Sequence, residues 1–516
     1  MESEKVLYIP LDDRPVNLAL VQELGKISNI DIITPPKEIL GQFFQKGQCH
    51  EISNWLKNTK GQVLIISLDM LLYGGLIASR SSETLKEEAL ELLNTVREFK
   101  RENPTVKIYA FSNIMRLSIS ISGDESEVWW RKINKYNELR YKIEILGELN
   151  LQGDLDKLIS EIPEIVLENY LNSRKRNHIL NMEAINLVKD EIVDFLIMSQ
   201  EDCSPYGLHW IEHKVINDEI NKYFLKDKVY VYPGADEIGQ ILLARYINDS
   251  TKSYPKVFVV YDDEGRSNNI PKFEDRPLKD NINEHLKSLG TISVDNIESC
   301  DLVLAVTTPN MPYIDMAEDN MDNYNKKEII DDFVSKLKKY SYKGKVIALA
   351  DLSLANGGDL YLIDRLREED LLLKITAYSG WNTAGNALGT AIAHGNIISN
   401  LINNNNLSLN KSINSLRFLL ERYADDFFYQ SIVRRDTAKI VIEENLSIFN
   451  MENINVRVNN YVEKTLDTLM KEYFIGINID YLEAKGIVSE IDVKATLPWN
   501  RVFETECSIK LKLQEV

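Results

Sequence analysis

Acidic side chains recur in this sequence at points where an apolar run gives way to a turn. Asp12 and Asp13 follow the first such run, and Glu201 and Asp202 follow a later one. A protonated carboxyl can donate to a leaving oxygen while a second carboxylate attacks or activates water, which is the chemistry of glycoside hydrolysis. Neighbouring residues on an extended chain point to opposite sides, so either Asp202 or Glu201, and not both, should face the site. We therefore expect Asp202 and either Asp12 or Asp13 to form a catalytic pair.

Further polar side chains occupy equivalent positions after other apolar runs. The carboxyl ends of parallel strands lie at one edge of a sheet or barrel, so these side chains are expected to bind one substrate. The expected substrate-binding residues are Arg14, Asp69, Arg80, Asn113, Arg116, Gln200, Asp236, Glu237, Asp262, Asp351, Asn356, Asp359, Trp381, Asn382 and Asn386. Trp381 could stack on the apolar face of a sugar ring, with burial in the core as the competing interpretation.

Other interpretations of the same acids stay open. A carboxylate at a helix start also caps backbone N–H groups, which accounts for one acid in each pair. Four aspartates could instead hold Mg²⁺ or Mn²⁺ for hydrolase or lyase chemistry on a phosphorylated or anionic sugar, with arginines clamping the anion. Those four are Asp12, Asp69, Asp202 and Asp351. We expect no cofactor and no metal site, with a divalent metal as the alternative.

One short motif matches a zinc pattern. His209, Glu212 and His213 spell H-x-x-E-H, and on a helix both histidines would share one face. Three fixed residues are a weak signal in a long chain, so we interpret the segment as a partly buried helix beside the site. No Walker A, GxGxxG or GxSxG motif occurs at a strand end, which disfavours nucleotide and serine-hydrolase chemistry.

The elements that must position these residues alternate along the chain. Helical patterns such as 83–102 and 326–339 separate most of the apolar, β-branched runs, as in parallel βαβ units. The runs predict strands at 6–11, 30–34, 63–68, 106–111, 194–199, 229–233, 256–261, 291–294, 302–306, 346–350 and 374–378. This alternation predicts the α/β class.

Two similar halves predict two doubly wound, parallel-sheet (Rossmann-like) halves around a cleft, with a (β/α) barrel as the alternative. We expect a first α/β domain at 1–250 with a helical insertion at about 124–190, and a second α/β domain at 251–400. A mostly helical region at 401–516 is expected to end on a strand pair near 490–513.

The composition and charge of the chain argue against some classes of binding partner. The chain has 516 residues, of which 44% are hydrophobic and 27% charged, and its net charge of -19 does not suit phosphate neutralisation. It shows no signal peptide and no apolar stretch of membrane-spanning length, and its four cysteines are scattered. We expect a cytoplasmic protein with a small-molecule carbohydrate substrate, without nucleic-acid or membrane partners. The oligomeric state stays open.

Several motifs together resemble one protein family. They are IPLDDRPVN, YGGLIASR, SQEDCSPYG, GADEIG, LANGGD and YSGWNTAGNALGTA. In this order they resemble an uncharacterised bacterial family, domain-of-unknown-function family 4127, over at least residues 5–400. The resemblance implies no mechanism and no catalytic residue, and only an association with sugar utilisation. The surplus of acids at strand ends, Trp381 with its neighbouring amides and the absence of nucleotide motifs favour a glycoside hydrolase acting on a small glycoside, with an amino-sugar glycoside as one candidate. A non-catalytic sugar-binding protein is the third hypothesis.

Overall fold

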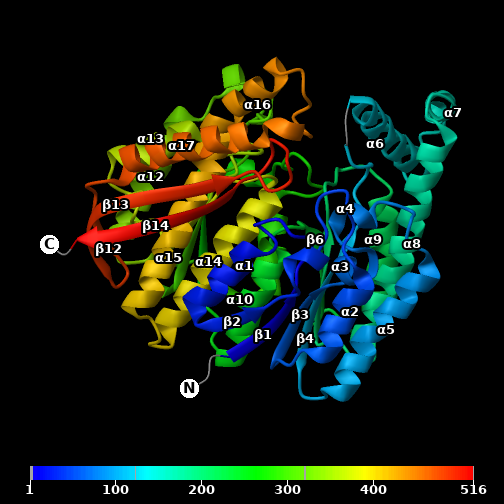
Figure 1. Ribbon diagram of the computed structural model, residues 1–516, viewed down its shortest axis with the longest axis horizontal. Coiled ribbons are helices and arrows are strands. Elements are labelled where there is room, and N and C mark those ends of the chain that lie inside the picture. Colours follow the sequence, from blue (N-terminus) through cyan, green and yellow to red (C-terminus); the bar gives the residue numbers. More distant parts are fainter. Residues whose placement is uncertain (1–3, 122–123, 319–320, 515–516) are drawn as a thin grey trace. The chain divides into compact units, whose positions relative to one another are not determined.

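The computed structural model describes residues 4–121, 124–318 and 321–514, and the chain forms two compact units (Figure 1). The first unit comprises Met1–Asp13, Asp31–Leu242 and Phe273–Arg276, and the second comprises Arg14–Ile30, Leu243–Lys272 and Pro277–Val516. Each unit has its own open parallel sheet, which confirms the α/β class and two doubly wound halves in place of a barrel.

The first unit is built on a six-stranded sheet in the order β2-β1-β3-β4-β5-β6, counted over the described residues. Its strands are β1 (Glu4–Ile9), β2 (Ile30–Ile33), β3 (Val63–Ser67), β4 (Lys107–Ile114), β5 (Phe195–Gln200) and β6 (Val229–Pro233). Every residue of β3 and β5 is buried, as expected for a parallel sheet covered on both faces. The chain passes from β1 to β2 on one side of it, and then from β2 to β3 on the other side of β1. The topological switch point therefore lies between β1 and β3.

Helices of the first unit connect these strands. They are α2 (Cys49–Asn58), α3 (Leu68–Tyr73), α4 (Leu76–Ser79), α5 (Lys86–Glu102), α6 (Asp124–Glu144), α7 (Gln152–Ser160), α8 (Glu164–Lys189) and α9 (His209–Lys222). The expected insertion at about 124–190 is helical and consists of α6, α7 and α8. It has small apolar clusters of its own, one around Tyr136, Leu139 and Leu155.

The second unit contains a five-stranded parallel sheet, again counted over the described chain, in the order β11-β10-β9-β7-β8. Its strands are β7 (Lys256–Tyr261), β8 (Ile292–Ser293), β9 (Leu302–Val306), β10 (Val346–Ala350) and β11 (Ala377–Ser379). The unit also contains α1 (Ala19–Ser28), α11 (Leu278–Ser288), α12 (Lys327–Tyr342), α13 (Leu360–Glu368) and α14 (Ala384–Asn403), and the unit boundary at Leu242 falls within α10 (Ile238–Thr251). Its switch point lies between β7 and β9.

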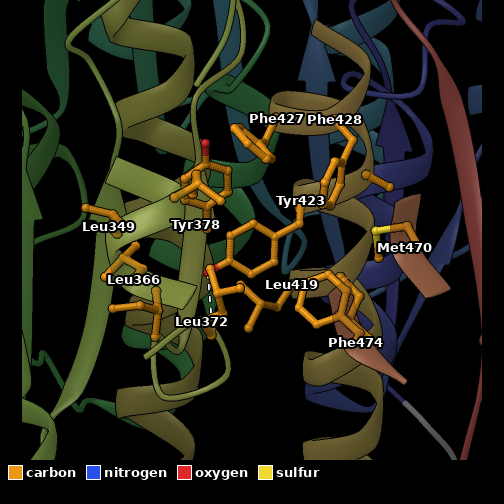
Figure 2. Packing of buried hydrophobic residues seen from close by; sticks show 14 of the residues in the cluster. Leu349, Leu366, Leu372, Tyr378, Leu419, Tyr423, Phe427, Phe428, Met470 and Phe474 are labelled. Carbon is orange, nitrogen blue, oxygen red and sulfur yellow. Dashed lines mark hydrogen bonds between the residues drawn. The ribbon is translucent and has the colours of Figure 1, made fainter. Parts of the chain in front are cut away.

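The C-terminal part of the second unit packs on this sheet. It contains α15 (Leu409–Arg422), α16 (Arg434–Glu443), α17 (Asn455–Phe474), β12 (Asn478–Tyr481), β13 (Ala484–Thr496) and β14 (Glu506–Gln514). β13 and β14 are antiparallel, which confirms the strand pair expected near 490–513. Figure 2 shows Tyr423 at the centre of the shared core, stacked on Tyr378 with ring centroids 4.7 Å apart and donating to the Leu372 carbonyl oxygen at 3.0 Å.

All eleven predicted strands are present, with ends shifted by a few residues. Their positions were predictable because buried parallel strands are continuous apolar runs bounded by polar turns. No helix in the described parts of the chain is both long and apolar enough to cross a membrane.

Candidate functional site

The switch point of the first sheet carries three carboxylates from two adjacent strands. Asp12 and Asp13 follow β1 and are buried, and Asp69 lies two residues after β3, in the first turn of α3. The turn after α3 approaches the end of β1 closely: a Cβ on Gly75 would lie 3.3 Å from the Leu11 carbonyl oxygen and 3.8 Å from the Asp12 Cβ. Gly75 has a φ of +119°, which favours glycine. The chain therefore holds Asp12 beside the α3 turn.

Asp69 is only 2% exposed, and its environment favours the protonated carboxyl. Burial raises the pKa of Asp69 to about 7, with the charge of Glu201 adding to the increase, although hydrogen bonds from Asn113 oppose it. The backbone N–H of Asn113 donates to Oδ2 at 2.8 Å and its side-chain amide donates to the same atom at 3.2 Å. Because both hydrogen bonds are accepted by Oδ2, the other carboxyl oxygen, Oδ1, can carry the proton.

Beside Asp69 lies a buried ion pair between Arg80 and Glu201. Arg80 donates through Nε to Glu201 Oε2 at 3.3 Å and through Nη2 to Oε1, while Nη1 donates to Ser120 at 2.7 Å. This is the two-pronged geometry that fits a guanidinium to a carboxylate. Arg176 of α8 holds the end of α4, just before Arg80, by donating to the Ser79 carbonyl oxygen at 2.6 Å.

A second ion pair lies next to the first. Arg116 follows β4, and its Nη2 lies 2.5 Å from Oδ2 of Asp202. Asp202 has a φ of +31°, and 28% of its side chain is exposed. Its electrostatic effect, like that of Arg116, reaches the guanidinium of Arg80. The two pairs thus form one charged group, made by Arg80 at the end of α4, Arg116 after β4, and Glu201 and Asp202 after β5.

Gln200 and Asn113 belong to the same edge of the sheet. The Ser199 hydroxyl donates to Asn113 Oδ1, and Gln200 donates through Nε2 to the Glu201 carbonyl oxygen at 3.1 Å. Gln200 Oε1 lies 3.0 Å from His213 Nε2. Because the amide oxygen can only accept, His213 donates from Nε2. Burial lowers the pKa of His213 to about 3, so it is neutral.

The H-x-x-E-H segment forms helix α9, as predicted. Glu212 pairs with Arg174 at 2.7 Å, and His209 lies 3.4 Å from Asp275. Burial alone would raise the pKa of Asp275, but His209 and the adjacent arginine hold it well below its usual range. Within the described residues, no three His, Cys, Asp or Glu side chains gather closely enough to hold a metal ion.

Asp236 and Glu237 follow β6, at the far end of the same edge. Glu237 accepts from the Ala235 backbone N–H at 2.9 Å. Its Oε1 would lie 1.9 Å from a Cβ placed on Gly234, so that turn requires glycine. Burial raises the pKa of Tyr8 well above its usual value, and the charges of Asp12 and Asp236 add to the increase. These two acids therefore act on a common neighbour.

The switch point of the second sheet holds a different kind of site. Asp262 follows β7, and its Oδ1 accepts from the backbone N–H of Thr308 at 2.9 Å and from its hydroxyl at 2.7 Å. Its Oδ2 pairs with Lys326, which is fully buried and also donates to Thr308 O and, at 3.0 Å, to Ser353 Oγ. Two hydrogen bonds and one ion pair therefore hold the Lys326 ammonium, which suits a structural tether.

Asp351 follows β10 and belongs to a buried hydrogen-bond network. It accepts from the Thr307 hydroxyl at 3.1 Å, from Tyr378 at 3.2 Å and from the Asp359 backbone N–H at 2.7 Å. Asp359 caps α13 and accepts from Tyr324 at 2.7 Å. Burial raises the pKa of Asp351 to about 7, helped by the charge of Asp359. The pKa of Asp359 is raised as well, again chiefly by burial.

A small pocket of about 20 Å³ lies against Asp351. Its polar lining residues include Ser353, Lys272 and Asn382. Lys272 is held by Asp315 at 2.8 Å. A water molecule needs roughly 10–15 Å³ of such space, whereas ligand pockets span roughly 300–1,000 Å³. By its volume, this pocket can hold a water molecule but not a sugar ring.

Asn356, Asn382 and Asn386 lie in the same unit. Asn356 Nδ2 donates to Asp315 at 2.8 Å, and its backbone N–H donates to the Asn382 carbonyl oxygen at 2.9 Å. Both residues have a positive φ, 60° and 68° respectively. Asn386 is buried in the first turn of α14, where its backbone N–H contacts the capping hydroxyl of Thr383.

Trp381 and Arg14 contact aromatic rings of the second unit. Trp381 is 5% exposed, and its ring packs edge-on against Phe503 with centroids 5.9 Å apart. The Arg14 guanidinium lies 4.8 Å from the ring centroid of Trp499. Burial of this kind leaves little of the Trp381 face for stacking on a ligand.

Three groups in these networks are absent from the residues expected from the sequence. Lys326 stands at a helix start with no distinguishing pattern, and Tyr324 precedes it in a polar segment. Asp426 accepts from Ser379 at 2.6 Å and from the Gly380 backbone N–H at 3.0 Å. A signal for Asp426 does exist, because paired acids inside the apolar run YADDFFYQSIV are unusual.

The family expectation is confirmed: the chain belongs to a family described as protein of unknown function (DUF4127), whose model matches residues 6–508. Neither the curated proteins nor the solved structures contain a match to the chain.

Proposed function

Because family membership assigns no activity, we propose from the site geometry that this protein is a glycoside hydrolase acting on a small glycoside at the carboxyl edge of the first sheet. The observation that carries the proposal is the buried carboxyl of Asp69, whose pKa of about 7 keeps a proton available at neutral pH. A general acid works best when its pKa lies near the working pH. Glu201, paired with Arg80, supplies a fixed negative charge beside it.

In the proposed reaction, Asp69 donates its proton to the glycosidic oxygen as the bond to the anomeric carbon breaks. Asp12 or Asp13, on the adjacent strand, supplies the carboxylate that attacks the anomeric carbon or activates water. If that carboxylate attacks the anomeric carbon, water then cleaves the glycosyl–enzyme bond and passes its proton to Asp69, which now acts as the base. If it activates water instead, the water oxygen forms the new bond as its proton passes to that carboxylate, and Asp69 regains a proton from solvent. Asp202 is a member of the catalytic pair expected from the sequence, but its contact with Arg116 suits binding better than catalysis.

The test is release of aglycone from a panel of aryl glycosides and disaccharides between pH 5 and pH 9. Asp69→Asn removes the acid while keeping the acceptor for Asn113, so the rate is expected to fall roughly 10²- to 10⁴-fold. The wild-type rate should decline above pH 7, because the donor is then ionised. Asp218→Asn, an exposed position on α9, serves as the matched control and should keep full activity.

Two results would count against the proposal. Absence of release from every glycoside in the panel would remove the assigned activity. An Asp69→Asn protein with an unchanged rate and pH profile would remove Asp69 from the mechanism.

A further inference from the structure

The ion pair between Arg116 and Asp202 uses only part of the guanidinium. Asp202 contacts Nη2, whereas Nε is buried and has no hydrogen-bond partner among the residues that the structure describes. A buried donor without a partner carries a desolvation cost. Nε and Nη2 form the side of the guanidinium that matches the two oxygens of a carboxylate. One of the two donors on that edge thus has no hydrogen-bond partner among the described residues.

The neighbouring pair shows what a completed edge looks like. Arg80 reaches both oxygens of Glu201, through Nε and Nη2, and its remaining nitrogen donates to Ser120. The side chains of Arg80 and Glu201 are 6% and 7% exposed. Each of the three guanidinium nitrogens of Arg80 thus donates a hydrogen bond. Arg116 therefore differs from Arg80 because its Nε has no hydrogen-bond partner among the described residues.

Asp202 is the partner that can leave. Its side chain is 28% exposed, and its φ of +31° places a non-glycine residue in a sparsely populated backbone region. Residues held in such regions store a modest strain and gather at binding sites and switches. A change of the Asp202 backbone conformation would release this strain, which lowers the cost of separating its carboxylate from Arg116.

Arg116, in contrast, is held in place. Its carbonyl oxygen accepts from Nη1 of Arg174 at 3.1 Å and from the hydroxyl of Tyr170 at 3.4 Å, both on α8. A fixed backbone lets the guanidinium keep its position when its partner changes. Burial lowers the pKa of Arg80, and the nearby charge of Arg116 lowers it further, although Glu201 opposes both. Two cations thus lie close together, and the departure of Asp202 would leave one without its counterion.

We propose that Arg116 binds the carboxylate of the substrate, which replaces Asp202 on its Nε–Nη2 edge, and that the substrate is a glycoside of a sugar acid. This inference rests on the proposed function and specifies the substrate class for the same site. The incoming carboxylate makes two parallel N–H···O bonds where Asp202 makes one contact. Asp202 acts as a placeholder that keeps the arginine paired when no substrate is bound.

Binding is measured separately from turnover. Glucuronic acid, glucose, glucose 6-phosphate and inorganic phosphate are titrated into wild-type protein and into Asp69→Asn, with thermal shift and calorimetry as readouts. Asp202→Asn removes the competing charge and should bind glucuronate roughly 10- to 100-fold more tightly, whereas Arg116→Gln should bind it more weakly by a similar factor. Arg101→Gln, an exposed arginine on α5, is the matched control.

Preference for glucuronate over glucose, together with tighter binding by Asp202→Asn, supports the inference. Equal binding of glucose, stronger binding of glucose 6-phosphate or phosphate, or an Asp202→Asn protein that binds glucuronate no better would overturn it. If Arg116→Gln fails to fold, the Asp202→Asn result decides. Hydrolysis of neutral glycosides as fast as glucuronides would sink this inference and leave the proposed function standing; glucuronate binding without hydrolysis of any glycoside would do the reverse.

Discussion

The ionisation of Asp69 should make the stability of the protein depend on pH in a defined way. An aspartate in an unfolded chain titrates near 3.9, whereas folding raises the pKa of Asp69 to about 7. Between these values the folded state binds a proton that the unfolded state lacks. The contribution of Asp69 to the free energy of unfolding is therefore fully present below the unfolded pKa and is lost as pH rises through the folded pKa.

The magnitude follows from the shift. One pKa unit corresponds to about 1.4 kcal/mol, so a group about 1.5 units below its folded pKa, at pH 5.5, contributes about 2 kcal/mol. At pH 8.5 the contribution is close to zero. Asp69→Asn removes this dependence, because an amide does not ionise, and its oxygen can still accept the two bonds from Asn113.

The assay is urea denaturation of wild-type and Asp69→Asn proteins at pH 5.5, 7.0 and 8.5. The difference in unfolding free energy between the two proteins should shift by about 2 kcal/mol in favour of the variant from pH 5.5 to pH 8.5. Other buried carboxyls such as Asp351 titrate in both proteins and cancel in the difference. Identical pH dependence in the two proteins would refute the argument that burial holds a proton on Asp69.

Two further perturbations probe the charged networks. Arg80→Met leaves Glu201 buried without its partner, so the free energy of unfolding should fall by about 3–5 kcal/mol; a loss below 1 kcal/mol in urea denaturation would show that the pair is not desolvated. In the second unit, Asp359→Asn removes a negative charge that raises the pKa of Asp351, so that pKa should move down from about 7 while burial keeps it above its usual value. Carbon-13 NMR titration of the aspartate carboxyls measures this shift, and an unchanged or higher pKa would contradict the assignment.

The candidate site was predictable only in part. Asp12, Asp69 and Asn113 lie at or just after strand ends. The sequence predicts strand ends where polar residues follow an apolar run. These residues lie on one edge of the sheet because their strands are parallel and adjacent. The proton on Asp69 was not predictable, because its pKa depends on how completely the surrounding helices exclude water.

Local patterns in the sequence determined the α/β class, the eleven strands of the two parallel sheets and the helical insertion, since burial and periodicity are properties of neighbouring residues. Only the tertiary structure decided the strand order, and with it which distant side chains meet. Arg80 and Glu201 are separated by 121 positions, and Lys326 reaches Asp262 from a helix start without any motif. Such pairs form where loops from different strands converge, and no short-range pattern encodes that convergence.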